Sequence, residues 1–166
     1  SSVVVTCGTF LNGLIHIGEK TFRAGRLGER GSYGLTENLV SLGLSFGRLK
    51  TGTPPRINKN SVDFNYTVPA PGDSSYLPFS LSTKKGKKKQ VDCFLINTNS
   101  TCHDIINKNI TTSAMFSGKI TGVGPRYCPS IEDKIVRFSN KSSHHLFLEP
   151  EWFGSSQLYV AGFSTS

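Results

Sequence analysis

The sequence predicts an α/β protein in which short strands alternate with amphipathic helices and glycine-rich turns. Residues 1–6 hold three consecutive valines, an apolar run typical of a strand in a parallel sheet covered on both faces. Residues 129–138 place Ile131, Ile135 and Phe138 on one face of a helix. The 166 residues include 17 glycines and 8 prolines, which indicates many turns between such elements.

The first part of the chain combines extended segments with glycine turns. The expected strand at 1–6 ends in a turn that contains Gly8 and Thr9. Ligands gather where the strands of parallel sheets end, so this turn is a candidate nucleotide contact. Residues 14–19 form a second extended stretch with the character of a hairpin. Residues 22–34 are rich in glycine and arginine, a composition that favours a phosphate-binding loop.

A helix and a strand are expected next. Leucines at positions 35, 39 and 42 mark one helix face, and Gly43 is suited to the C′ position that ends such a helix. Residues 44–50 have the pattern of a strand. The segment 52–56 contains two prolines that stiffen the backbone, and a domain boundary is expected close to it.

The second half begins with a polar, irregular segment at 57–90. It contains five lysines at 84–89, which suit phosphate groups but equally suit a solvated loop tip. Thr101 is expected to cap a helix, with Asp104 three residues further on. The remaining predicted strands lie at 91–97, 144–149 and 158–160.

Charge and cysteine usage limit the function classes. The net charge of +8 and the pI near 9.5 favour polyanionic partners such as RNA, or phosphorylated cofactors. The four cysteines form no Cys-x-x-Cys pair, so we expect no metal site and read the thiols as reduced and intracellular. The sequence contains no signal peptide and no membrane span. It has the look of an internal fragment.

The segment 122–138 is the strongest candidate for chemistry. Its glycines and Pro125 predict a tight turn that leads Cys128 to the start of a helix, beside Arg126. A helix start can hold a phosphate or stabilise a thiolate. Glu132 and Asp133, in the first turn, act against a thiolate. An inert, buried cysteine is the alternative that the local pattern leaves open.

Several blocks of this sequence resemble the MnmG (GidA) family. The most specific are Arg-Leu-Lys-Thr-Gly-Thr-Pro-Pro-Arg at 48–56 and Pro-Arg-Tyr-Cys-Pro-Ser-Ile-Glu-Asp-Lys at 125–134. The blocks follow the order of the family over nearly all 166 residues. They lie at 8–10, 16–18, 47–56, 122–134, 147–151 and 164–166.

The resemblance implies a Rossmann-type FAD-binding domain and an inserted mixed-sheet NAD-binding domain. Residues 1–50 would be part of the first, 51–160 the inserted domain, and 161–166 the return toward the first. The family is implied to install a carboxymethylaminomethyl-type group at carbon 5 of the wobble uridine of tRNA. It uses methylenetetrahydrofolate, FAD and NADH and works with a GTPase of the MnmE type. The resemblance also implies a homodimer that does not associate with a membrane. Its expected location is the cytoplasm, or mitochondria or plastids if the source is eukaryotic.

The resemblance also assigns roles to residues. Cys128 corresponds to the cysteine proposed to form a covalent bond to the pyrimidine or to the carbon carrier, and Ser32 to a serine that contacts FAD. Ser32, together with Gly8 and Thr9 of the turn described above, makes up the set of candidate FAD contacts. The expected NAD contacts form one continuous stretch. They are Gly124, Pro125, Arg126, Tyr127, Cys128, Pro129, Ser130, Ile131, Glu132, Asp133, Lys134, Ile135, Val136, Arg137 and Phe138.

Three family features are absent from these residues: the Gly-x-Gly-x-x-Gly flavin fingerprint, a second functional cysteine and a C-terminal helical region. We therefore expect the chain alone to bind FAD poorly and to be inactive. Two other functions remain open at this point. One is a folate- and FAD-dependent tRNA uridine methyltransferase, and the other is a non-catalytic, basic RNA-binding module.

Overall fold

The computed structural model describes residues 2–75, 78–83, 89–124, 127 and 129–166. The chain divides into two compact units. Unit 1 comprises Ser1–Thr51, Asn109–Tyr127 and Ser166, and unit 2 comprises Gly52–Lys108 and Cys128–Thr165. Helices and sheets are mixed along the chain, so the predicted α/β class is confirmed.

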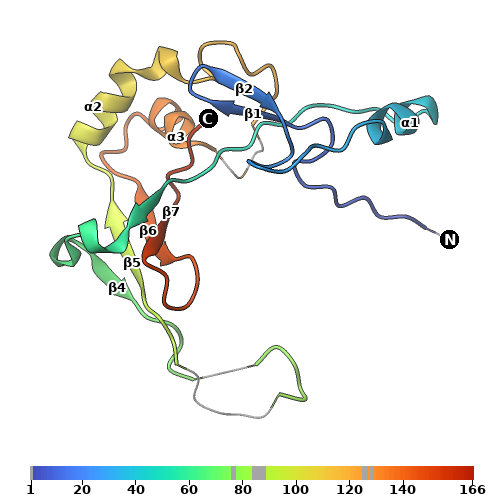
Figure 1. Cartoon of the computed structure of the whole chain (residues 1–166). Coiled ribbons are helices and arrows are strands. Elements are labelled where there is room, and N and C mark those ends of the chain that lie inside the picture. Colours follow the sequence, from blue (N-terminus) through green and yellow to red (C-terminus); the bar gives the residue numbers. More distant parts are fainter. Residues whose placement is uncertain (1, 76–77, 84–88, 125–126, 128) are drawn as a thin grey trace. The chain divides into compact units, whose positions relative to one another are not determined.

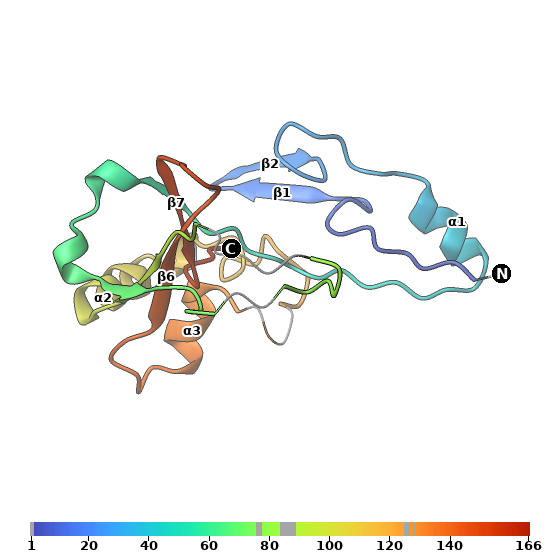
Figure 2. The same cartoon turned by 90° about the horizontal axis from the view of Figure 1, so that it is seen from below.

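Unit 1 contains a hairpin and a short helix. Strands β1 (Leu14–Ile17) and β2 (Lys20–Arg23) pair antiparallel, and they lie side by side in both views (Figures 1 and 2). This confirms the hairpin expected from the sequence. Helix α1 (Leu35–Ser41) follows, and a 3-10 helix (Ile110–Thr112) belongs to the second part of the unit.

Helix α1 ends as its sequence predicts. Gly43 adopts φ +89°, and its N–H donates to the carbonyl of Val40 at 2.9 Å. The N–H of Leu44 donates to the carbonyl of Leu39 at 3.1 Å. These two bonds form a Schellman motif, which requires a left-handed residue after the helix and therefore favours glycine.

Two predicted strands of unit 1 are wrong. Residues 2–6 adopt no regular structure, and Val3 and Val4 are 88% and 83% exposed. No described strand runs beside them, and a strand requires a neighbouring backbone as well as apolar side chains. Residues 44–50 likewise form no strand. An isolated bridge between Leu49 and Val123, and a hydrogen bond from Arg48 Nη1 to the carbonyl of Asn12, tie this segment to other parts of the unit.

Unit 2 is built on an antiparallel sheet with strand order β3-β7-β6-β5-β4 (Figure 1). The strands predicted at 91–97, 144–149 and 158–160 are confirmed, with small shifts of their ends. The five strands are β3 (Arg56–Asn58), β4 (Val68–Ala70), β5 (Cys93–Asn97), β6 (His145–Pro150) and β7 (Gln157–Ala161).

One face of this sheet forms the core of unit 2. Leu146 and Leu148 of β6 pack with Leu158 and Val160 of β7, and all four are buried. Phe147, between the two leucines, is 41% exposed because alternate residues of a strand point to opposite faces. Two 3-10 helices (Lys59–Ser61 and Phe64–Tyr66) follow β3, and apolar residues of this region pack against the core.

Two α-helices complete unit 2, and they pack against each other. They are α2 (Ser100–Lys108) and α3 (Ile131–Arg137). The predicted cap of α2 at Thr101 is wrong. Asn99 takes that role, because its Oδ1 accepts the N–H of Cys102 at 2.9 Å and Asn99 stands directly before the helix.

Candidate functional site

Two loops of unit 1 bring together Gly8, Thr9 and Ser32, the candidate flavin contacts. The hydroxyl of Thr9 donates to the carbonyl of Gly25, and the N–H of Ser32 donates to the carbonyl of Phe10, each at 2.8 Å. Gly8 has φ +53°, and apart from its chain neighbours no described atom lies within 4 Å of the position that a Cβ would take. Its backbone is therefore open to close approach by another molecule.

An open hollow of about 460 Å³ lies beside these loops within unit 1. Its lining combines two arginines, one carboxylate, one phenol and the start of β1. The lining residues are Asn12, Gly13, Leu14, Arg23, Tyr33, Glu37 and Arg48.

Polar contacts organise the wall of this hollow. The side-chain amide of Asn12 donates to Glu37 Oε1 at 2.9 Å, and Arg48 Nη1 donates to the carbonyl of Asn12 at 3.1 Å. The hydrogen bond from Asn12 is the main reason that the pKa of Glu37 is lowered, so this carboxylate is anionic at neutral pH. Arg23 and Arg48 together outweigh its charge, and the hollow suits an anionic group such as a phosphate.

Sequence reasoning missed most of this hollow. The arginine content of 22–34 indicated phosphate binding, and Arg23 falls in that range. Arg48 was noted only as the first residue of the family-like block 48–56, with no role assigned to it. Asn12 and Glu37 carried no signal, because their hydrogen bond joins a turn to a helix that are distant in the sequence.

Helix α3 lies in the stretch predicted to contact NAD. It begins at Ile131, and Ser130 is its N-cap, so the expectation that Pro129 is the first helical residue is wrong. The hydroxyl of Ser130 accepts the N–H of Asp133 at 3.4 Å. The first N–H groups of a helix have no acceptor within the helix, and a serine at the cap position supplies one. The N–H of Ile131 donates to the carbonyl of Ser164 at 2.7 Å. Both amides are therefore engaged within unit 2.

The two sides of α3 differ in exposure. Ile131 and Ile135 are buried, as their spacing predicts, and the carboxylate-bearing Asp133 is also buried. Arg137 places its Nε 3.5 Å from Asp133 Oδ1, one turn back along the helix. Phe138, predicted to share the apolar face, is 44% exposed. It follows the last helical residue, where the backbone has left helical geometry.

Lys134 ties α3 to the end of the chain. Its Nζ donates to the carbonyl of Gly162 at 2.7 Å. Partial burial lowers the pKa of the Lys134 ammonium. The contact fixes the cation on the backbone of the segment that follows β7.

Two of the blocks that carry the family resemblance, 47–56 and 164–166, are distant in the sequence but meet in unit 2. Thr53 and Thr165 exchange backbone hydrogen bonds of 3.3 Å, in an antiparallel bridge. A Cβ on Gly52 would lie 2.6 Å from the carbonyl oxygen of Thr165, so only glycine fits there without displacement. Through the Ile131–Ser164 bond, the segment at 164–165 also contacts the start of α3.

Part of the predicted site lies outside the described residues. Pro125, Arg126 and Cys128 belong to this group, and so does 84–88 of the lysine run. Within the described part of the stretch, Tyr127 is 81% exposed and Pro129 is half-buried.

The described residues contain neither a metal-binding cluster nor a membrane-spanning helix. No cluster of three histidine, cysteine, aspartate or glutamate side chains there is arranged to hold a metal ion. No described helix combines the length and hydrophobicity that crossing a bilayer requires.

Comparisons with known proteins give a consistent result. The sequence model of the family "Glucose inhibited division protein A" matches residues 1–166. The chain is 55% identical over 167 aligned residues to the tRNA uridine 5-carboxymethylaminomethyl modification enzyme MnmG of Chlorobaculum tepidum, and 53% identical over 165 residues to that of Thermodesulfovibrio yellowstonii. Each alignment covers 99% of this chain.

The fold agrees with the sequence match. The crystal structure of Aquifex aeolicus GidA (form I) superposes with a TM-score of 0.83 at 46% identity, over 97% of this chain and 28% of that one. The chain spans 26–27% of the length of the two MnmG relatives. A match to the family over every residue, together with the superposition on a solved member, establishes that this chain belongs to the glucose inhibited division protein A (GidA/MnmG) family.

Proposed function

We propose that the chain is part of a flavoenzyme that modifies the wobble uridine of tRNA. The enzyme installs a carboxymethylaminomethyl-type group at carbon 5, with methylenetetrahydrofolate, FAD and NADH and together with an MnmE-type GTPase. The observation that supports this most is the family match over residues 1–166, because its relatives are named for that reaction. The net charge of +8 is consistent with an RNA substrate.

The domain assignment is part of the proposal. Residues 1–50 belong to the FAD-binding domain, 51–160 to an inserted NAD-binding domain, and 161–166 to the return toward the first. The proposal includes a homodimer in the cytoplasm, or in an organelle of a eukaryotic source.

The residues of unit 1 fit an anionic dinucleotide such as FAD. The open backbone at Gly8 allows close approach, and Arg23 and Arg48 supply cationic groups at the hollow. We assign Gly8, Thr9 and Ser32 to contacts with this cofactor. These residues would hold the cofactor, and bound FAD would supply the redox chemistry of the reaction.

The proposed NADH contact is the stretch 124–138. Within its described part, the side chains of Val136, Arg137 and Phe138 are exposed and accessible to a ligand. Arg137 adds a cation suited to a phosphate, while the buried residues of α3 hold the helix in place.

Cys128 is the proposed nucleophile. Carbon 5 of uracil becomes reactive when a thiolate adds to carbon 6, because the electrons of the double bond then move toward the carbonyl at carbon 4. Loss of the proton from carbon 5 and departure of the thiolate later restore the double bond. An attack of Cys128 on the carbon carrier is the second possible role of the same sulfur.

The test is made in the organism that encodes the protein. Its gene is deleted, and the wobble uridines of its tRNA are analysed by mass spectrometry. We expect the carboxymethylaminomethyl-type group to disappear and to return with the wild-type gene. The gene carrying Cys128→Ala should fail to restore it, whereas Cys102→Ala, a matched change in α2, should restore it.

Other outcomes separate the alternatives. Loss of a 5-methyluridine instead would identify a folate-dependent methyltransferase. Unchanged tRNA in the deletion strain would contradict the enzymatic proposal and favour an RNA-binding module. If the Cys128→Ala gene fully restored the modification, Cys128 would have no part in the chemistry. The proposed tRNA modification activity would still stand.

A further inference from the structure

The hairpin between β6 and β7 ends in two consecutive, exposed aromatic residues. Trp152 is 61% exposed and Phe153 is 62% exposed. They stand in the connection that follows Pro150, the last residue of β6, and precedes Gln157, the first residue of β7. Large aromatic side chains that are exposed to solvent can bury their apolar surface against a binding partner.

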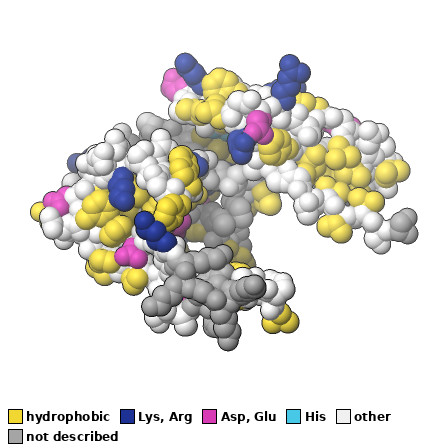
Figure 3. Space-filling view, turned by 60° about the horizontal axis from the view of Figure 1, so that its bottom comes forward, with side chains coloured by type: hydrophobic (Ala, Val, Ile, Leu, Met, Phe, Trp, Pro, Cys, Tyr) yellow, Lys and Arg dark blue, Asp and Glu magenta, His cyan; other side chains and the backbone are white. Residues whose placement is uncertain are grey.

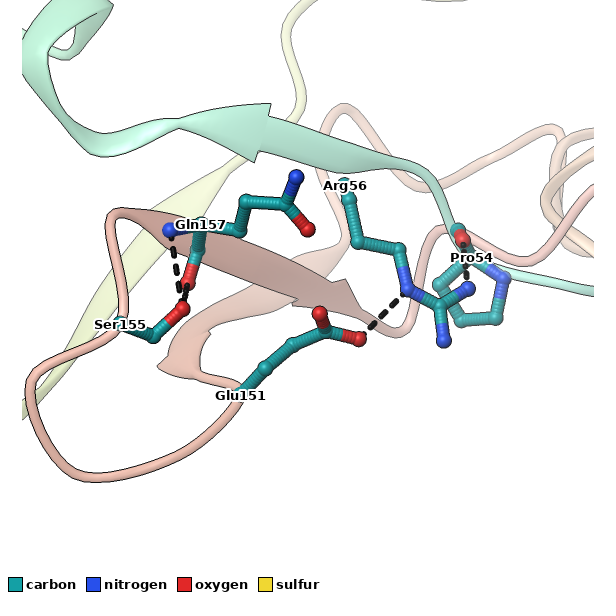
Figure 4. A network of polar contacts seen from close by, with 5 residues as sticks. All are labelled: Pro54, Arg56, Glu151, Ser155 and Gln157. Atoms are coloured by element: carbon teal, nitrogen blue, oxygen red, sulfur yellow. Dashed lines mark hydrogen bonds and ion pairs between the residues drawn. The ribbon is translucent and has the colours of Figure 1, made fainter.

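The backbone of this connection is held by several hydrogen bonds. The N–H of Ser155 donates to the carbonyl of Trp152 at 3.0 Å, and the hydroxyl of Ser155 accepts the N–H of Gln157 at 2.9 Å. At its base, Glu151 Oε1 lies 2.7 Å from Arg56 Nε on β3 (Figure 4). A connection fixed in this way loses little conformational entropy when a partner binds.

A cation lies next to one of the two rings. Lys89 Nζ is 5.2 Å from the centroid of the Phe153 ring, within the range of a cation–π contact. Lys89 comes from the segment before β5, which is distant from the hairpin in the sequence. Two exposed aromatic residues that are neighbours in the sequence, with an ammonium group beside the second ring, therefore lie at this one turn, which we call the aromatic tip.

This combination matches the chemistry of unpaired nucleotides. Bases that are not in a double helix stack on aromatic side chains, and lysines bind the phosphates between them. We infer that the aromatic tip is a contact site for unpaired nucleotides of RNA, with Trp152 and Phe153 as stacking platforms and Lys89 on a phosphate. The inference rests on the proposed function, in which RNA is the substrate, and it assigns residues to RNA binding.

The charge and the proposed function together favour RNA over the other partners that bind tryptophan. Lipid headgroups also attract Trp and Lys, and a net charge of +8 suits any polyanion, but RNA is the substrate in the proposed function. The space-filling view shows Lys and Arg side chains, and Asp and Glu side chains as well, among apolar ones (Figure 3). Vesicles therefore serve as the competing probe in the test.

Trp152 is the only tryptophan of the chain, so its fluorescence reports on the aromatic tip. We would titrate the 166-residue chain with a single-stranded oligouridine RNA, and with a fully paired RNA duplex at the same nucleotide concentration. The expected result is saturable quenching by the single strand and weaker quenching by the duplex, whose bases are already stacked.

Variants then test each group by anisotropy of a labelled oligouridine. Phe153→Ala and Trp152→Ala should each weaken binding about tenfold, the usual loss for one stacked base. Lys89→Gln should reduce the slope of log affinity against log salt by about 0.7, the value for one phosphate of a single strand. Tyr66→Ala, at an 85% exposed aromatic of the same unit, is the matched control and should bind as the wild type.

Three results would overturn the inference. They are absence of RNA binding, RNA binding without a change in Trp152 fluorescence, and a Trp152 response to anionic phosphatidylserine vesicles but not to RNA. Circular dichroism verifies that each variant is folded. Should a variant unfold, the Trp152 titration of the wild type still decides. These measurements are independent of the gene deletion. A failed aromatic tip therefore leaves the proposed function untouched, and an unchanged tRNA pool in the deletion strain leaves the binding data standing.

Discussion

His103 of α2 and His144, the residue before β6, lie with their ring centroids 5.4 Å apart. Thr98 joins them: its Oγ1 is 2.8 Å from His103 Nε2 and accepts the N–H of His144 at 2.8 Å. His144 is buried, and its Nε2 has no hydrogen-bond partner among the described residues. A proton on His144 would therefore be placed in a desolvated position that already faces positive charge.

The stability of unit 2 should fall in mild acid because of His144. Burial, followed by the charges of His103, Lys134 and Lys141, lowers the pKa of His144 below its ordinary 6.5. The unfolded chain then binds more protons than the folded chain once the pH drops below 6.5, so the free energy of unfolding decreases through that range. Urea unfolding at a series of pH values from 7.5 to 5 measures the effect.

Removal of the imidazole tests this assignment. His144→Phe keeps a ring of similar size and should flatten the dependence of unfolding free energy on pH. His145→Gln, at the exposed neighbour, serves as the control and should leave the dependence in place. An unchanged profile in His144→Phe would mean that other groups cause the acid sensitivity.

Ser130→Ala should destabilise α3. The change removes the hydroxyl that accepts the N–H of Asp133, and Ser130 is only 1% exposed, so water does not easily replace it. Loss of an N-cap costs about 1 kcal/mol of unfolding free energy. Ser139→Ala, at an exposed residue just beyond the helix, should change it little. Equal stability of both variants in urea would argue against the capping role.

Gly52→Ala should weaken the bridge between Thr53 and Thr165. The added Cβ would lie 2.6 Å from the carbonyl oxygen of Thr165, and relief of that overlap requires a backbone shift. We expect a loss of about 1–3 kcal/mol in unfolding free energy, typical of overpacking. Gly47→Ala places its Cβ in open space among the described atoms and should be neutral within about 0.5 kcal/mol. Thermal melting of both variants distinguishes these outcomes.

Arg48→Gln should reduce flavin affinity if the hollow of unit 1 holds the cofactor. A guanidinium bound to a phosphate is a charge-assisted contact, and its loss should weaken binding about tenfold. Arg30→Gln changes an arginine of the nearby loop that does not line the hollow, and it should bind flavin normally. The measurement is a titration of flavin fluorescence with the protein as its organism makes it. Equal affinity of both variants would place the cofactor elsewhere.

The sequence predicted helices and strands correctly where residues close together in the chain determine them. The leucine spacing and Gly43 defined α1, and the apolar core of 91–97 defined β5. The valine run near the N-terminus was misread because side chains alone do not make a strand. It also needs a paired neighbour, which no described residue supplies for 2–6. The cap of α2 was misplaced by two residues because Thr101 and Asn99 both have capping side chains.

Tertiary structure determined what the candidate sites contain. The family blocks established the class of protein and named Cys128, whose role stays a prediction. Only the fold brought Asn12, Glu37 and Arg48 to one hollow, and only the fold placed Lys89 beside Phe153. The physical reason is the range of the interactions. Periodicity and capping act over a few residues and can be read from the sequence, whereas ion pairs, ring contacts and strand pairing join residues whose proximity exists only after the chain has folded.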